Sequence, residues 1–222
     1  MDYIQAKGIR IHNARGVYSI PMAEFALSGV LQLYKQSRFF WNNQKEHRWE
    51  KHRGLLELSG KNVCIVGCGS VGSACAKRFQ AFDCSVQGID IVARETAFFD
   101  NIVPLELLDA LLPEIDILVL TLPLTPQTNH LIDRQRIEKM KPGAILINIA
   151  RGAIVDTKAL TPALQNQLGG AVLDVFEEEP LHADSPLWKL DNVIISPHNS
   201  FVGEGNSDRL SRLIIENLEN FE

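Results

Sequence analysis

Short β-branched runs alternate with amphipathic segments from residue 61 to residue 196. The runs are apolar at nearly every position, which is typical of strands buried on both faces, and the segments between them have the period of helices. Strands separated by helices pair in parallel, and right-handed crossovers cover both faces of the sheet. We therefore predict an α/β fold built on a doubly wound parallel sheet. The predicted strands are residues 62–67, 84–90, 116–122, 144–150, 170–175 and 192–196, and the predicted helices are residues 71–81, 105–112, 133–140 and 157–167.

A strongly patterned helix precedes this core, with Ser19 predicted as its N-cap and Pro21 in its first turn. Its apolar residues form two faces, one with Met22, Phe25, Ala26, Gly29, Val30 and Leu33, the other with Ala23, Leu27, Leu31 and Tyr34. A helix that is apolar nearly all round must be covered on more than one side. Its own sheet can cover one face, and a second subunit is a natural cover for the other. We predict a homodimer interface over residues 19–53; the alternative is an intramolecular core helix followed by a surface loop.

Composition and charge narrow the function classes. The chain has 22 Lys and Arg against 27 Asp and Glu, a net charge of −5, and no dense basic block, so we expect no nucleic-acid partner. The apolar runs are too short to span a bilayer, and the N-terminus lacks the features of a signal peptide, so we expect no membrane association and a cytoplasmic location. The four cysteines form no CxxC pair, and we expect no metal site.

A glycine-rich turn follows the first predicted strand, with the pattern GxGxxG from Gly67 to Gly72. This pattern alone is weak, but a strand before it and a helix after it supply the context that a diphosphate site requires. Gly67 is expected to make the tight turn, Gly69 to let a diphosphate approach the backbone, and Gly72 to let the helix close on the strand. Ser70 and Val71 open the helix, whose unpaired N–H groups and positive dipole end attract an anion.

The second predicted strand ends at Asp90, 18 positions after Gly72 (90 − 72). A carboxylate there can accept hydrogen bonds from both ribose hydroxyls of an adenosine and repels a 2′-phosphate, which favours NAD over NADP. Arg94 lies four positions further on and can partly compensate a phosphate, so NADP stays open. A carboxylate that only ends a strand is the structural alternative. Together, the turn and the acidic residue predict a Rossmann-type NAD-binding domain.

Four polar phrases follow later strands. They begin at Thr121, Asn148, Leu173 and Ile195 and read TLPLTPQT, NIARGAIVD, LDVFEEEP and ISPHN. Every phrase lies at the carboxyl end of a predicted strand, where ligands bind in open α/β sheets.

Together with the glycine turn, these phrases resemble the D-2-hydroxyacid dehydrogenase family over nearly the whole chain. The resemblance implies a hydride transfer between NAD(H) and a small 2-hydroxy or 2-keto acid, with Arg151, Glu179 and His198 as the catalytic residues. It implies that Asp174 holds the nicotinamide carboxamide and that Asn148 and Thr121 line the cofactor cleft. The full set of cofactor contacts expected from these phrases is Thr121, Pro123, Asn148, Ala150, Asp174 and His198.

The chemistry gives each catalytic residue a reason. Reduction of a 2-keto acid adds a proton to the carbonyl oxygen, and imidazole titrates near neutral pH, which suits His198 to the transfer. A carboxylate beside it stabilises the protonated ring; Glu177 and Glu178 are alternatives to Glu179, which the resemblance selects. Arg151 offers a permanently charged fork of donors for a carboxylate and a carbonyl oxygen. No partner is evident for the remaining histidines, His12, His47, His52, His130 and His182, which we interpret as surface or packing residues.

The resemblance also predicts a domain division. We expect residues 1–14 to be a remnant of a substrate-binding domain, residues 15–202 to be the dinucleotide-binding domain, and residues 203–222 to be a helix leading toward the substrate domain. Family members carry a long segment before the point that matches Met1. With only one wall of the substrate cleft, this chain is expected to bind NAD(H) but to reduce 2-keto acids slowly or not at all.

Two other functions remain open. A non-catalytic NAD-sensing protein or co-repressor-like interaction protein keeps the same fold. A formate or phosphite dehydrogenase fits less well, because the formate enzymes typically have Gln where this chain has Glu179. The identity of the 2-hydroxy acid is left open by the sequence.

Overall fold

The protein is built around one seven-stranded sheet in which every neighbouring pair is parallel. The computed structural model describes residues 2–8, 11–91 and 97–219. The strand order is β3-β2-β1-β4-β5-β6-β7, with β1 near the middle. The predicted doubly wound parallel sheet is therefore confirmed. The strands are β1 Asn62–Val66, β2 Ser85–Ile89, β3 Asn101–Val103, β4 Ile117–Leu120, β5 Ile145–Asn148, β6 Gly170–Leu173 and β7 Val193–Ile195.

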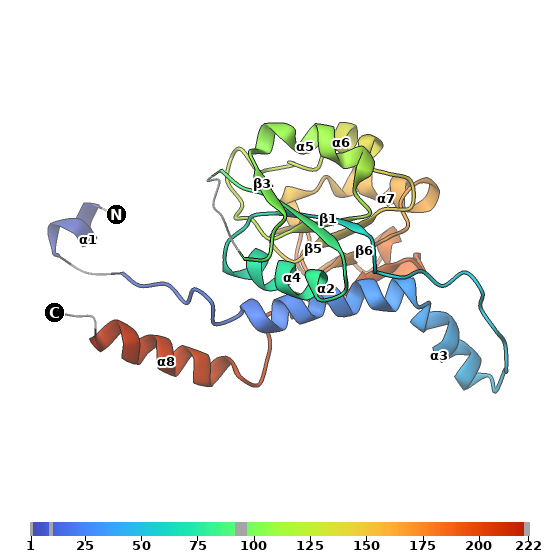
Figure 1. The fold of residues 1–222 in the computed structure, drawn as a ribbon, viewed down its shortest axis with the longest axis horizontal. Coiled ribbons are helices and arrows are strands. Elements are labelled where there is room, and N and C mark those ends of the chain that lie inside the picture. Colours follow the sequence, from blue (N-terminus) through green and yellow to red (C-terminus); the bar gives the residue numbers. More distant parts are fainter. Residues whose placement is uncertain (1, 9–10, 92–96, 220–222) are drawn as a thin grey trace.

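Helices cover both faces of the sheet (Figure 1). On one face, α2 (Ser19–Tyr34) packs along α4 (Ser70–Gln80), and their buried residues share a core with strand residues such as Ile65 and Val119. The other face carries α5 (Leu108–Leu111), α6 (Arg134–Lys139) and α7 (Thr157–Asn166) over a second core. Asp133 and Asp156 cap α6 and α7. Each accepts a hydrogen bond from the N–H group of the third residue of its helix.

Two predictions about local structure differ from the observed elements. The predicted helix at 105–112 is a series of short turns, η1 (Leu105–Leu107), α5 and η2 (Leu112–Glu114), and the last of these contains the proline at 113, which has no N–H to continue an α-helix. Strand β3 was not predicted; it has only three residues and pairs with β2 at the edge of the sheet.

The prediction that Ser19 caps α2 is wrong. The helix begins at Ser19, its N-cap is Tyr18, and the buried Ser19 hydroxyl has no hydrogen-bond partner among the described residues. Further along α2, Gly29 lies so close to β6 that an added Cβ would stand 2.6 Å from the Val172 methyl groups. The helix therefore rests directly on the sheet.

Three segments extend from the body of the molecule (Figure 1). After α2, the helix α3 (Ser37–Lys45) and the coil up to residue 57 project to one side, while α1 (Asp2–Ala6) and α8 (Asn206–Glu219) lie at the other. Helix α8 has no buried residue, and Arg209 ties its start to the Val17 carbonyl (2.7 Å). Within the described ranges, no helix combines the length and apolar character needed to cross a bilayer.

Candidate active site

The predicted site residues gather along one edge of the sheet. All strands run in parallel, so their carboxyl ends meet at the same edge. The glycine turn follows β1, Thr121 follows β4, Arg151 follows β5, Asp174 follows β6 and His198 follows β7. The sheet thus brings together segments that are far apart in the sequence.

The glycine turn is shaped by close backbone contacts. Gly67 has φ +99°, its N–H donates to the Ile89 carbonyl (2.8 Å), and a Cβ there would lie 2.8 Å from the N of Leu122. Gly72 faces the same turn, and an added Cβ would overlap the Gly67 carbonyl. Gly69 is different, because a Cβ there would meet nothing within 4 Å. The turn is closed on the protein side and open on the side that a diphosphate would occupy.

A hollow of about 470 Å³ lies beside this turn. It includes five of the predicted cofactor residues, Gly67, Gly69, Asp90, Thr121 and Pro123. The predicted residues Ser70, Val71 and Gly72 form the first turn of α4, whose N-cap is Gly69. The prediction did not include several other lining residues: Val66, Ile89, Ile91, Leu105, Leu122, Thr125, Gln127 and Thr128. An open glycine and the start of an 11-residue helix at one hollow fit a dinucleotide diphosphate.

Two polar side chains brace the turn from the second and fourth strands. Asp90 accepts a hydrogen bond at Oδ2 from the Cys68 N–H (2.8 Å). Thr121 donates from Oγ1 to the Gly67 carbonyl (2.7 Å). Both residues also line the hollow, so the structure gives each of them a contact to the turn in addition to the predicted place beside a cofactor. Arg94 lies outside the described residues.

Arg151 stands on a turn that Asn148 organises. The Asn148 side chain is buried, donates to the Arg151 carbonyl (2.9 Å) and accepts from the Ala150 N–H (3.1 Å). The exposed Arg151 guanidinium donates from Nη1 to the Ala150 carbonyl (2.6 Å). The next turn, η3 (Gly152–Ile154), carries the chain back toward α7. Asn148 therefore shapes the Arg151 turn from inside.

Asp174 is a buried carboxylate directed at the His198 loop. It is 1% exposed, and it accepts from the Asn199 N–H (2.7 Å), the Ser200 N–H (3.0 Å to Oδ2) and the Ser196 hydroxyl. Its carbonyl accepts from the His198 N–H (2.8 Å). These donors compensate the burial of the charge. They also fix the loop that presents His198.

The second hollow, of about 530 Å³, contains an imidazole and carboxylate pair. His198 Nδ1 lies 2.9 Å from Glu179 Oε2, and Glu179 Oε1 accepts from the Phe176 N–H (3.0 Å). His198 has a left-handed backbone (φ +53°), and its side chain is 43% exposed. The other lining residues were not predicted from the sequence: Phe176, Pro180, Leu181, Trp188, Ile195 and Pro197.

The charge state of Glu179 follows from its surroundings. Partial burial opposes ionisation, but hydrogen bonds from His198 and from the Phe176 N–H outweigh it and hold the pKa of the Glu179 carboxyl below its ordinary value. The carboxylate is therefore ionised at neutral pH and lies within hydrogen-bonding distance of the His198 ring.

Each of the three consecutive glutamates contacts a different histidine. Glu179 pairs with His198, whereas Glu177 Oε1 lies 2.7 Å from His130 Nε2 and Glu178 Oε1 lies 3.0 Å from His182 Nε2. This arrangement places Glu179, rather than its neighbours, at the His198 ring. It also corrects the interpretation that His130 and His182 lack partners. His52 has contacts too, with the Gly54 N–H and the Phe39 ring.

The four cysteines lie in the core of the molecule. All four are buried outside any disulfide, and burial raises the pKa of Cys64 and of Cys75 to about 12. Over the described ranges, the histidine, cysteine and acidic side chains form no group of three that suits a metal ion.

Comparison with known proteins identifies the class. Residues 27–200 match the family model "D-isomer specific 2-hydroxyacid dehydrogenase, NAD binding domain". The chain belongs to the D-isomer-specific 2-hydroxyacid dehydrogenase family and contains its NAD-binding domain.

Individual relatives show the extent of the match. A glyoxylate reductase of Thermofilum pendens is 37% identical over 96% of this chain and 65% of its own length. An (S)-sulfolactate dehydrogenase of Chromohalobacter salexigens is 34% identical over 98% of this chain and 72% of its own. The crystal structure of a D-lactate dehydrogenase from Aquifex aeolicus with NAD and lactic acid has a TM-score of 0.80 and 32% identity, covering 99% of this chain and 71% of that one. The chain thus spans about two thirds of the length of these relatives.

Proposed function

We propose that this protein transfers a hydride between NAD(H) and C2 of a small 2-hydroxy or 2-keto acid. The observation that carries the proposal is the pairing of His198 Nδ1 with Glu179 Oε2 at 2.9 Å, at the same sheet edge as the glycine turn. This is an acid–base pair at the carboxyl ends of the strands, the same edge of the sheet at which we assign the diphosphate to the glycine turn. The relatives named for glyoxylate and sulfolactate support this substrate class.

The cofactor is held by the first hollow in this proposal. The N–H groups of Ser70, Val71 and Gly72 at the start of α4 bind the diphosphate, and Asp90 accepts from the adenosine ribose. We assign Pro123, which lines the first hollow beside Thr121, and Ala150, which precedes Arg151, to the same cofactor site. When bound, NADH supplies the hydride that reduces the keto carbon. Because Asp90 carries a negative charge, the site favours NAD over its phosphorylated form.

His198 moves the proton in this proposal. Its Nδ1 is engaged by Glu179, which leaves Nε2 to donate a proton to the carbonyl oxygen during reduction and to accept it during oxidation. Arg151 binds the substrate carboxylate with its fork of donors and must turn away from the Ala150 carbonyl to do so. Asp174 acts through the His198 loop as well as beside the nicotinamide.

NADH fluorescence tests the cofactor half of the proposal. We expect titration of the 222-residue chain with NADH to saturate, and NADPH to bind more weakly. Glyoxylate, hydroxypyruvate and lactate-type keto acids are then offered to the NADH complex, and loss of NADH absorbance is followed. A chain that fails to bind either dinucleotide contradicts the proposal. Because His198 and Glu179 are 43% and 37% exposed, water reaches the pair, and we expect slow turnover by this chain alone.

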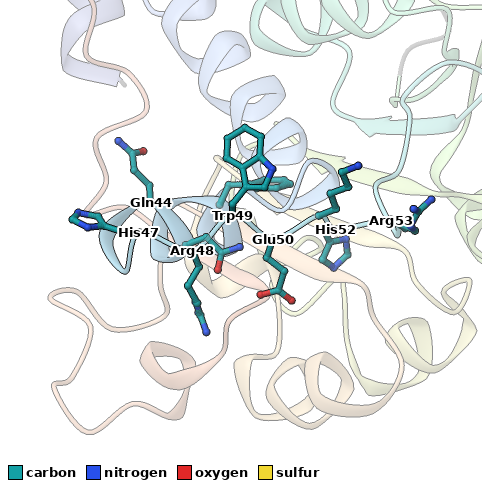
Figure 2. A pocket seen from close by; sticks show the side chains of 10 residues that line it. Gln44, His47, Arg48, Trp49, Glu50, His52 and Arg53 are labelled. Atoms are coloured by element: carbon teal, nitrogen blue, oxygen red, sulfur yellow. The ribbon is translucent and has the colours of Figure 1, made fainter.

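We further propose that residues 19–53 form a homodimer interface. On this segment Trp49 is 99% exposed and Trp41 is 64% exposed, a concentration of apolar surface that a second copy would cover. A hollow of about 760 Å³ lies between α3 and the following coil, and Figure 2 shows Trp49 and Glu50 projecting in different directions beside it. The Asn43 amide is buried there with no hydrogen-bond partner in the described parts of the chain.

Light scattering measures this association directly. We expect a dimer at micromolar concentration and a shift toward monomer in Trp49→Ser. Leu107→Ser, which removes an exposed apolar residue far from the segment, is the matched control and should leave the dimer unchanged. A monomeric wild-type chain would contradict the proposal.

The domain division also remains a proposal. We assign residues 15–202 to the dinucleotide-binding unit, residues 1–14 to a second unit and residues 203–222 to the helix that leads toward it. The exposed apolar residues Ile214 (50%) and Leu218 (62%) of α8 support a contact beyond the sheet. Limited proteolysis should cleave near residues 14 and 203 before it cleaves the sheet; early cleavage within β1 to β7 would count against the division.

A further inference from the structure

The pair formed by His130 and Glu177 joins three loops at the edge of the sheet that carries the site. Glu177 follows β6, and its Oε1 lies 2.7 Å from His130 Nε2 in the loop after β4. Its other oxygen, Oε2, accepts from the Thr157 N–H (3.0 Å) at the start of α7, beyond the Arg151 turn. One carboxylate therefore connects the loops that follow β4, β5 and β6.

The backbone strengthens the connection between the first two loops. The His130 N–H donates to the Ala153 carbonyl (2.7 Å), and the Ile132 N–H donates to the Ile154 carbonyl (3.0 Å). Ile132 also forms an isolated parallel bridge with Val155. Residues 130–132 thus run alongside the segment that immediately follows Arg151.

The connection between the second and third loops is steric. Gly152, next to Arg151, has no room for a side chain, because an added Cβ would overlap the carbonyl of Phe176. Phe176 in turn donates its N–H to Glu179 Oε1 (3.0 Å). The Arg151 turn and the Glu179 carboxylate therefore share one support, the backbone at Phe176 and Glu177.

His130 is held in an uncommon conformation at this junction. Its φ of +49° lies in the left-handed region, which a residue with a side chain rarely adopts without compensating contacts. The contact with Glu177 is such a compensation. Partial burial raises the pKa of Glu177, but hydrogen bonds from Thr157 and His130 outweigh it and lower that pKa overall, so the carboxylate is charged at neutral pH.

We propose that His130 and Glu177 are positioning residues that fix the Arg151 turn relative to the Glu179–His198 pair. The inference rests on the proposed function, since it assigns the pair a part in holding a 2-keto acid between Arg151 and His198. The pair does not touch the reacting atoms. Its effect is to keep the two sides of the substrate site at a constant separation, on which the rate of an oriented reaction depends steeply.

The chain offers a matched control for this inference. His182 and Glu178 form a second histidine–glutamate pair on the same loop, at 3.0 Å, with side chains that are 66% and 75% exposed. That pair is local, four residues apart, and within the described parts of the chain its hydrogen bonds reach neither the Arg151 turn nor α7. An exposed pair contributes little to overall stability, so removing the His182–Glu178 pair should leave the melting temperature nearly unchanged.

The test compares His130→Gly with His182→Ala in the 222-residue chain. Glycine tolerates the left-handed backbone, so His130→Gly removes the ring without adding strain. In His130→Gly, we expect the amide NMR signals of Gly152 and Phe176 to shift, kcat/KM for keto-acid reduction to fall about tenfold, and the Kd for NADH to stay unchanged. His182→Ala should alter none of these quantities. Glu177→Gln, which keeps the shape of the side chain, should lie between the two.

Two results would overturn the inference. The first is a His130→Gly protein whose Gly152 and Phe176 amide signals stay in place, and the second is an equal loss of kcat/KM in His130→Gly and His182→Ala. Failure of the wild-type chain to bind NADH would instead refute the proposed function, and the amide comparison would still decide whether the pair holds the two loops together.

Discussion

The two hollows of the site are lined by different kinds of group, backbone at the glycine turn and side chains at the His198–Glu179 pair. Around Gly67 and Gly72 the first hollow is bounded by backbone atoms, and an added methyl group at either position would collide with backbone atoms. At the other end, His198 and Glu179 are side chains with 43% and 37% exposure. The glycine turn should therefore tolerate little added volume. Substitutions of His198 or Glu179 should leave the fold intact but lower the reaction rate. Mutations that separate binding from catalysis test this difference.

The largest expected effect is on the reaction rate in His198→Asn. Asparagine tolerates the left-handed backbone of His198 but cannot transfer a proton at neutral pH. The rate of keto-acid reduction should fall by about 10²- to 10⁴-fold, with NADH affinity unchanged. Single-turnover absorbance and NADH titration measure the two quantities. An unchanged rate would remove His198 from its proposed role.

Gly67→Ala should act in the opposite way. A Cβ at φ +99° is strained and would lie 2.8 Å from the N of Leu122, so the turn must move. Loss of one or two hydrogen bonds to the diphosphate should weaken NADH binding by about 10- to 100-fold. Gly69→Ala is the informative companion, because its Cβ meets no protein atom: it should fold normally and weaken binding only through contact with the ligand. Equal NADH affinity in all three proteins would contradict the assignment of this hollow.

Asp174→Asn should lower both stability and rate, because Asp174 is buried and its side chain holds the His198 loop. The amide nitrogen would replace one of the two carboxylate oxygens and would face at least the N–H group of Ser200, leaving a donor unpaired at a cost of about 1–3 kcal/mol in the free energy of unfolding. Displacement of the His198 loop should lower kcat about tenfold. Urea unfolding and steady-state kinetics test this. A loss of stability without any loss of rate would mean that the loop holds its shape by other contacts.

The smallest functional effect is expected at Asp116, at the amino end of β4 and the opposite edge of the sheet. Burial raises the pKa of this carboxyl, but hydrogen bonds from Lys141 and the Asn62 N–H outweigh it and lower the pKa overall. A lowered folded-state pKa contributes stability above the unfolded value of about 3.9, and this contribution is lost as pH falls through the folded pKa. Asp116→Asn should flatten the acid limb of the stability curve without changing NADH binding. Identical acid limbs in both proteins would contradict the role of this carboxylate.

The glycine turn could be predicted from the sequence. A glycine pattern between a β-branched run and a helical pattern constrains φ angles and close approaches, so the positions of Gly67, Gly69 and Gly72 follow from local chemistry. The strand ends were also predictable, because buried parallel strands read as continuous apolar runs. The sheet then brings Thr121, Arg151 and the later phrases to one edge whatever their side chains do.

The contacts of side chains were harder to predict. The pairing of His130 with Glu177 spans 47 positions, and no local pattern indicates it. The inward direction of the Asn148 side chain depends on the shape of the Arg151 turn, which the amino-acid sequence does not indicate. Strand β3 has three residues and little apolar signal, and the placement of Ser19 differs from the prediction by one position at a helix start, where boundaries are least determined.

The order of the strands has a consequence for how the site is synthesised. From β1 through β4, β5, β6 and β7, the order of the strands across the sheet follows their order along the chain. A ribosome therefore synthesises the glycine turn after β1 first and the His198 loop after β7 last. Deleting β7 would remove one outer strand and the loop that carries His198, whereas deleting β1 would divide the sheet between β2 and β4.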